Sequence, residues 1–260
     1  MLQAEDVPIF DDISIALSGG IISDAERDAL EGQVRANPED RKARVRLVGY
    51  YFGRQSLVRV PHVLWIIAHL PDADFAGSPF CAFYQFDDPD AYVAGVRAWQ
   101  VHTERDQIPA EVLLHAAAYL GLSQPEVAEA LLRRGMLAYP RNARFPDNLA
   151  RALALREPPK SAESLALFEQ ALVLLTGKED RFYLLAKVAQ TAFEAKEAAK
   201  AKAYAEELLV LAAAIDDWNT GNAIHHVNLV LGRLALQEGR VELTCDYLRK
   251  AGGIKGSPRM

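Results

Sequence analysis

Apolar side chains recur at helical spacing along most of this chain, with polar side chains between them. In the segment at 38–54, one face collects Val45, Leu47, Val48, Tyr51 and Phe52. Apolar positions separated by three or four residues are typical of an amphipathic helix. The basic residues that flank this face are predicted to lie on its solvated side: Arg41, Lys42, Arg44 and Arg46.

Capping signals mark where the predicted helices begin. Ser23 and Glu26 have the spacing of a capping box, and Asn37, which precedes a proline, is expected to cap the next helix. Asp88, also followed by a proline, is expected to open another helix. The predicted helices cover 23–36, 38–54, 56–70, 88–104, 109–121, 124–138, 146–156, 161–175, 179–195, 198–214, 219–237 and 240–251, with an irregular segment at 1–22 and an ordered loop at 71–87.

The pattern becomes regular in the second half of the chain. The last eight predicted helices form four hairpins, whose first helices begin near residues 109, 146, 179 and 219. This period of 33 to 40 residues is the spacing of helical-pair repeats. We therefore expect an N-terminal part at 1–107, made of the irregular segment and helices packed onto the repeats, and a repeat region at 108–260.

The last pair of helices carries the most specific motif. Its residues Leu231, Gly232, Ala235, Gly239, Leu248 and Ala251 stand where the tetratricopeptide repeat has its helix-packing and turn positions, whereas Thr244 departs from the usual Ala. The chain thus resembles tetratricopeptide-like proteins over about 109–251, and its segments at 46–52, 62–67, 218–226 and 255–258 resemble an uncharacterised bacterial group of helical-repeat proteins. The resemblance implies an all-α fold, a right-handed α-solenoid of stacked helical hairpins.

Composition supports a mostly helical, folded chain and narrows the classes of partner. The 260 residues include 42 Ala and 33 Leu, both strong helix formers, and half of all residues are apolar. A net charge of -6 argues against nucleic acid and against anionic membranes as partners. The two cysteines, Cys81 and Cys245, are far apart and suggest neither a disulfide framework nor a zinc cluster. With no secretory signal in the sequence, we expect a cytoplasmic protein.

The densest group of uncharged polar side chains lies on the first helix of the last hairpin. It comprises Trp218, Asn219, Asn222, His225, His226 and Asn228. In tetratricopeptide-like proteins the first helices line the concave surface where ligands dock. Asn222 and His226 share one helix face and are predicted to point into that groove, whereas His225 and Asn228 share another. The alternative is that Asn219 caps the helix and the other residues form structural hydrogen bonds.

Other candidate motifs are better explained structurally. The segment at 251–258 lacks the spacing and the preceding strand of a phosphate loop, so Gly252 and Gly253 are expected to cap a helix. His62 and His69 flank Trp65 on one helix face, which predicts core packing or an aromatic pocket. No metal, cofactor or catalytic group is expected.

Two classes of function follow from this pattern. The first is a non-catalytic scaffold that binds a protein or peptide through the concave face of its repeats. The alternative is a small-ligand sensor or an enzyme, with a site around the His225/His226 cluster. An open polar groove would favour the first class, and a deep enclosed pocket that holds the histidines and a carboxylate would favour the second.

Overall fold

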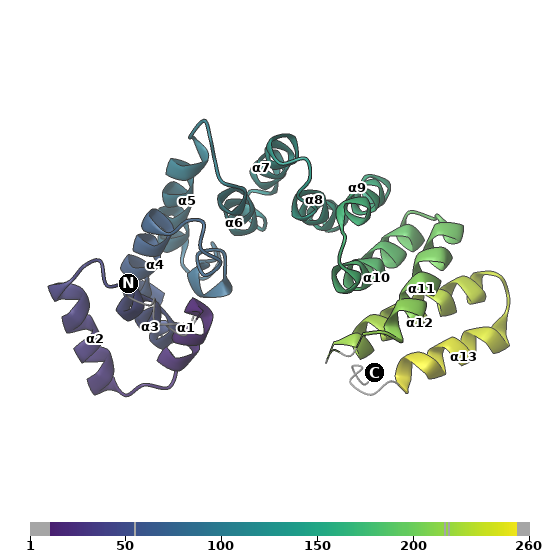
Figure 1. Ribbon diagram of the computed structural model, residues 1–260, viewed down its shortest axis with the longest axis horizontal. Coiled ribbons are helices and arrows are strands. Elements are labelled where there is room, and N and C mark those ends of the chain that lie inside the picture. The colour runs from purple at the N-terminus through teal and green to yellow at the C-terminus, as the bar shows by residue number, and fades with distance from the viewer. Residues whose placement is uncertain (1–10, 55, 216, 218, 254–260) are drawn as a thin grey trace, which may run out of the picture. The chain divides into compact units, whose positions relative to one another are not determined.

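A computed structural model describes residues 11–54, 56–215, 217 and 219–253 (Figure 1). These residues form helices joined by short connections, and they contain no strand. The helices are α1 (Asp12–Gly19), α2 (Asp24–Ala36), α3 (Arg41–Tyr51), α4 (Ser56–His69), the 3-10 helix η1 (Pro79–Cys81), α5 (Pro89–Thr103), α6 (Ala110–Leu120), α7 (Pro125–Ala138), α8 (Arg144–Ala154), α9 (Ser161–Leu174), α10 (Lys178–Glu194), α11 (Ala198–Ala212), α12 (Thr220–Gln237) and α13 (Val241–Gly252).

The expected helices are all present, with ends close to those predicted, and the segment expected to be irregular contains one more. That additional helix, α1, lies against α3 through glycines on both helices. A methyl group on Gly19 would overlap the carbonyl oxygen of Arg46, and one on Gly49 would overlap that of Ala16. Helix α1 therefore depends on a long-range contact between two backbones.

The predicted caps at the starts of α2 and α5 are confirmed, the one at the start of α3 is wrong, and Gly253 is the C-cap of α13 as expected. Ser23 and Glu26 form the reciprocal capping box of α2, and Asp88 accepts a hydrogen bond from the Ala91 N–H at the start of α5. Helix α3 is capped by Asp40, whose carboxylate accepts the Ala43 N–H at 2.9 Å, and not by Asn37. The extra turn before Asp40 accounts for the later helix start.

The chain divides into two compact units, Met1–Leu131 and Leu132–Met260, with the boundary inside α7. In the first unit, α1 packs on α3, the helices from α2 to α6 pack on their chain neighbours, and Trp99 is fully buried. The loop before α5 is ordered as expected, because Phe80 of η1 packs on the rings of Phe52 and Phe75. The predicted division at 107/108, between α5 and α6, remains a prediction about where the repeats begin.

The second unit contains three helical hairpins, α8/α9, α10/α11 and α12/α13. Large buried rings, including those of Phe145, Phe168 and Phe182, fill the core between the helices. Fully buried alanines, such as Ala189 and Ala201, occupy the positions where helices lie close together. None of the helices in the described part of the chain is long and apolar enough to cross a membrane.

Candidate functional site

The first helices of the three hairpins, α8, α10 and α12, each bury one face and leave a polar face outside. In α8, Phe145, Leu149 and Leu153 are fully buried at four-residue spacing. The same spacing leaves Arg144 exposed and Asp147 half-buried. Because a helix presents residues three and four apart on one face, this pattern holds the charged side chains along one side of α8.

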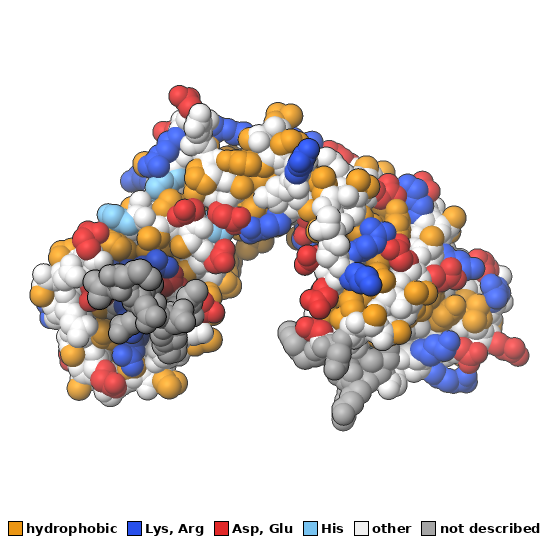
Figure 2. Space-filling model, in the orientation of Figure 1, with side chains coloured by type: hydrophobic (Ala, Val, Ile, Leu, Met, Phe, Trp, Pro, Cys, Tyr) orange, Lys and Arg blue, Asp and Glu red, His pale blue; other side chains and the backbone are white. Residues whose placement is uncertain are grey.

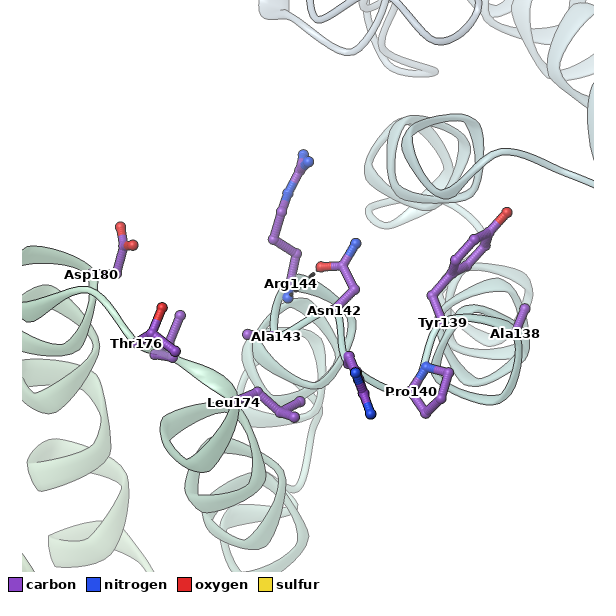
Figure 3. Close-up of a pocket in the computed structure, with 11 residues that line it drawn as sticks. Ala138, Tyr139, Pro140, Asn142, Ala143, Arg144, Leu174, Thr176 and Asp180 are labelled. Carbon is purple, nitrogen blue, oxygen red and sulfur yellow. Dashed lines mark hydrogen bonds between the residues drawn. The ribbon is translucent and has the colours of Figure 1, made fainter.

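A cavity of about 740 Å³ opens where α8 begins and the next hairpin follows. Its lining comes from the α7–α8 turn, the start of α8 and the α9–α10 connection: Ala138, Tyr139, Pro140, Arg141, Asn142, Ala143, Arg144, Leu174, Leu175, Thr176 and Asp180. In Figure 3 the polar ends of Tyr139, Arg144 and Asp180 point toward the same side of this cavity. Apolar side chains thus form its floor, with polar groups at its edge.

The elements around the cavity hold these polar side chains in place. The Tyr139 ring stacks on the buried ring of Phe145, with centroids 5.9 Å apart. The Asn142 side-chain oxygen accepts the Arg144 backbone N–H at 3.0 Å, which fixes the turn before α8 (Figure 3). The cavity wall is therefore built by local contacts within the second unit.

A second cavity of about 360 Å³ adjoins the first, and the two share Ala143, Arg144, Leu175 and Asp180. It continues along the facing sides of α8 and α10, where Arg151 and Tyr183 line it. The side chains of Arg151 and Asp147 form a two-point ion pair, with nitrogen to oxygen distances of 2.9 and 3.3 Å. Together the two cavities form a groove, which we call the α8–α10 groove.

Charge in the α8–α10 groove is mixed, with a small excess of cations. Its lining carries three arginines, Arg141, Arg144 and Arg151, and two aspartates, Asp147 and Asp180. Figure 2 shows acidic, basic and apolar side chains intermingled over the visible face of this unit.

The predicted site residues lie on the next first helix, α12, and divide between two faces. His226 is exposed and Asn222 is half-buried, whereas His225 and Asn228 are buried. Trp218, the other residue expected at this site, lies outside the described residues. Asn222 and His226 are therefore the two predicted residues of α12 that a partner can reach.

The two buried residues make hydrogen bonds within the fold. A ring nitrogen of His225, Nδ1, lies 3.1 Å from the carbonyl oxygen of Ala251, and because a carbonyl only accepts, Nδ1 donates. Asn228 donates to the carbonyl of Ile224 and also lines a cavity of about 430 Å³ beside Lys250. His225 thus joins α12 to α13, as the structural alternative for this cluster proposed. Asn219 is the N-cap residue of α12, but its side chain makes no capping hydrogen bond.

The His226 side chain lies near another histidine and a lysine, and part of it is shielded from water. Burial lowers the pKa of the His226 imidazole, and the nearby His225 and Lys187 lower it further. Lys187 lies on α10, so the polar faces of α10 and α12 come together at this point.

The two histidines around Trp65 differ in burial. His62 is buried and stacks on Tyr51 at 6.2 Å, while His69 is exposed and stacks on Trp65 at 4.5 Å. The core-packing interpretation therefore holds for His62.

Arg44, predicted on the solvated side of α3, is buried, because its guanidinium lies over the Trp65 ring and donates to the carbonyl of Pro38.

The residues of the α8–α10 groove were not predicted from the sequence. Tyr139, Asn142 and Arg144 sit in and after a turn, and Asp180 begins a helix, so each resembles an ordinary turn or surface residue. A signal was nevertheless present: the groove residues occur at the starts of consecutive first helices, which repeat stacking brings side by side.

Comparisons with known proteins support the fold assignment. No protein-family model and no curated protein matches this sequence. Among solved structures, "Crystal structure of MamA protein" matches with a TM-score of 0.50 and 16% identity, covering 74% of this chain and 92% of that one. Two further matches, "Crystal structure of MamA" and "MamA MSR-1 C2", have TM-scores of 0.48, with 18% and 17% identity, and cover 63% and 64% of this chain and 88% and 87% of those chains.

These observations define the class of protein as an all-α helical-repeat solenoid of the tetratricopeptide-like type. Within that class, the chain is similar in fold to MamA, a tetratricopeptide-like helical-repeat protein. The tetratricopeptide-like fold inferred from the sequence is thereby confirmed.

Proposed function

We propose that this chain is a non-catalytic scaffold that binds a protein or peptide along its first helices α8, α10 and α12. The observation that carries the proposal is the α8–α10 groove, in which two adjoining cavities share Arg144 and Asp180 at the start of the two helices. A long groove with an apolar floor and a polar edge suits an extended peptide better than a compact small molecule. The groove follows the helices that the repeat pattern indicated as the binding surface.

The polar groups favour a partner segment with acidic side chains or a free carboxylate. Arg141 and Arg144 edge the first cavity, and Lys187 lies close to His226 further along. Arginine can bind a carboxylate through two parallel hydrogen bonds. The Asn222 amide both donates and accepts, so it can hold a peptide backbone.

The pH dependence of this binding follows from His226. Its imidazole strengthens a bond to a carboxylate only when protonated, and its lowered pKa places that protonation below the ordinary value of 6.5. The affinity therefore weakens as pH rises through this lower range, while the arginines remain charged.

The alternative function, a ligand sensor or enzyme around His225 and His226, is not favoured by this geometry. The two rings stand nearly perpendicular, at 79°, and His225 is held by the Ala251 carbonyl. A general base needs access to the reacting proton, and a buried imidazole bonded to the backbone offers little such access.

We place the scaffold in the cytoplasm, where its free cysteines would remain reduced.

The proposal is tested by affinity capture from the native host followed by calorimetry with a peptide from the captured partner. Arg144→Ala probes the groove, Asn222→Ala with His226→Ala probes the α12 face, and Arg249→Ala is the control. Arg249 is an exposed arginine on the second helix α13, where it pairs with Asp246 of the same helix at 2.8 Å.

We expect Arg144→Ala to weaken binding on the order of 10-fold, because hydrogen bonds to charged groups contribute about 1.5–3 kcal/mol. The double variant should weaken binding less, and the Arg249 control should leave it unchanged. If the groove variants and the control bind the partner equally well, the partner docks elsewhere and the scaffold does not use its first helices.

A further inference from the structure

Three metal-ligating side chains meet in the first unit, away from the α8–α10 groove. They are Asp74 of the loop after α4, Glu111 of the first turn of α6, and His115 of the following turn. One ligand atom from each lies within 4.8 Å of the others. Glu111 and His115 are four residues apart, so the helix holds them on one face, with His115 Nε2 3.8 Å from Glu111 Oε2.

A contact on the other side of the His115 ring decides which ring nitrogen carries the hydrogen. Its Nδ1 lies 3.0 Å from the carbonyl oxygen of Pro71, which can only accept, so Nδ1 carries the hydrogen. In the neutral imidazole, Nε2 then presents a lone pair toward the two carboxylates. Ionised carboxylates also present lone pairs, so a cation between the three groups would meet a lone pair from each.

The surroundings of His115 hold its ring in this orientation. The residue is 7% exposed, and its ring meets the edge of Trp99 at 6.3 Å. Gly77 lies directly against the ring, because a methyl group at that position would overlap the imidazole. A histidine that donates one nitrogen to a backbone carbonyl and aims the other at an ion has the arrangement found in metal centres.

We infer that Asp74, Glu111 and His115 bind a divalent transition-metal ion, for which Zn²⁺ is the representative probe. One imidazole nitrogen with two carboxylate oxygens suits this class, whereas Mg²⁺ and Ca²⁺ are bound through oxygen. Three protein ligands leave at least one position for water or another group. Asp74 is exposed, so the ion can enter from solvent.

The site is independent of the proposed scaffold function, since it lies wholly within the first unit. It also differs from the expectation that the chain binds no metal. The sequence did not indicate it because Asp74 is far from the Glu111/His115 pair along the chain, and only the ordered loop brings them together.

Isothermal titration of the chelator-treated full chain with Zn²⁺, in excess Mg²⁺, tests the inference. We expect one equivalent to bind. Asp74→Asn, Glu111→Gln and His115→Gln should each weaken binding on the order of 10-fold or more. Asp74 is exposed, so its variant should remain folded, which circular dichroism checks.

Two matched controls identify the site. Asp72→Asn removes an exposed carboxylate from the same loop, and His69→Gln removes an exposed imidazole, and both should bind Zn²⁺ as the unmodified chain does. The inference is overturned if the folded chain takes up no Zn²⁺, or if Asp74→Asn and Glu111→Gln bind as tightly as the controls. In the first case the three side chains form a cluster that binds no ion, and in the second the ion binds at other histidines or at Cys245.

Discussion

The two units bury different kinds of polar side chain. In the first unit, the buried polar residues among those described are ionisable: Arg44, Arg59, His62, Asp88, His102 and His115. In the second, they are Ser164, Thr191, His225, Asn228 and Thr244, of which only His225 is ionisable. The first unit therefore buries groups that need charged or hydrogen-bonding partners, whereas the second buries mainly neutral polar groups.

Arg59 shows how the first unit accommodates a buried charge. Its guanidinium lies between the rings of Phe52 and Phe83, 5.2 and 4.9 Å from their centroids, and donates to the Ala82 carbonyl at 2.9 Å. Burial lowers the pKa of this guanidinium, yet an arginine stays charged in proteins. Aromatic faces and a carbonyl thus replace water around the charge.

The second unit makes its contacts within and between neighbouring hairpins. Ser164 at the start of α9 donates to the Ala150 carbonyl of α8 at 2.8 Å, which joins the two helices of one hairpin. Two of the three hairpin turns use a left-handed residue, with φ of 63° at Lys196 and 74° at Gly239. Because similar turns and contacts recur from hairpin to hairpin, the sequence of this unit is easier to interpret than that of the first.

The largest expected difference between the units concerns glycines at helix crossings. Gly49→Ala should destabilise the first unit by about 3 kcal/mol, because the added methyl group meets the Ala16 backbone, which cannot turn aside. Urea unfolding measures the change. The matched control is Gly32→Ala on α2, where the nearest atom to the new methyl group is the end of the Arg35 side chain at 3.9 Å. Equal stability of both variants would mean that α1 does not pack on α3.

A smaller effect is expected at Gly232, where α12 meets α13. A Cβ there would lie 3.5 Å from Tyr247 Cβ, which is an ordinary contact, so Gly232→Ala should be tolerated. Gly232→Leu should overpack the crossing and cost on the order of 1–3 kcal/mol, despite its better helix propensity. Thermal unfolding of the two variants measures the difference, and a leucine variant as stable as the alanine one would show that the crossing is looser than described.

The smallest expected effect is a pH dependence carried by the first unit. Burial lowers the pKa of His62, and Arg44 lowers it further against the opposing effect of Glu31. The unfolded chain then binds more protons than the folded one below pH 6.5, so stability is present above this pH and is lost as pH falls. His62→Gln should flatten the unfolding free energy between pH 7.5 and 5.5. The control His69→Gln, which replaces an exposed histidine, should keep the pH slope of the unmodified chain. If His62→Gln keeps that slope as well, the pH dependence arises from other groups.

The sequence predicted what short segments determine and missed what distant segments create. Periodicity and caps such as Ser23 and Asp88 predicted the helices of both units, because these signals act within one or two turns. Helix α1 and the burial of Arg44 were missed, since each depends on residues elsewhere in the fold.

The candidate site shows the same division. The separation of Asn222 and His226 from His225 and Asn228 follows from helical geometry and matches their burial. The α8–α10 groove could not be predicted in the same way, because it arises where a turn at Tyr139 meets a connection near Asp180 in the next hairpin. Whether a partner contacts these residues remains a prediction.

The two cysteines differ in exposure, so a thiol reagent can modify the folded chain at one of them. Cys81 is fully buried, and burial raises the pKa of its thiol, so alkylating reagents have neither access nor thiolate. Cys245 is exposed on the second helix α13 of the last hairpin. A maleimide dye added to the folded, unmutated chain would therefore attach at Cys245 alone. Its fluorescence would report on the last repeat while leaving the polar faces of the first helices untouched.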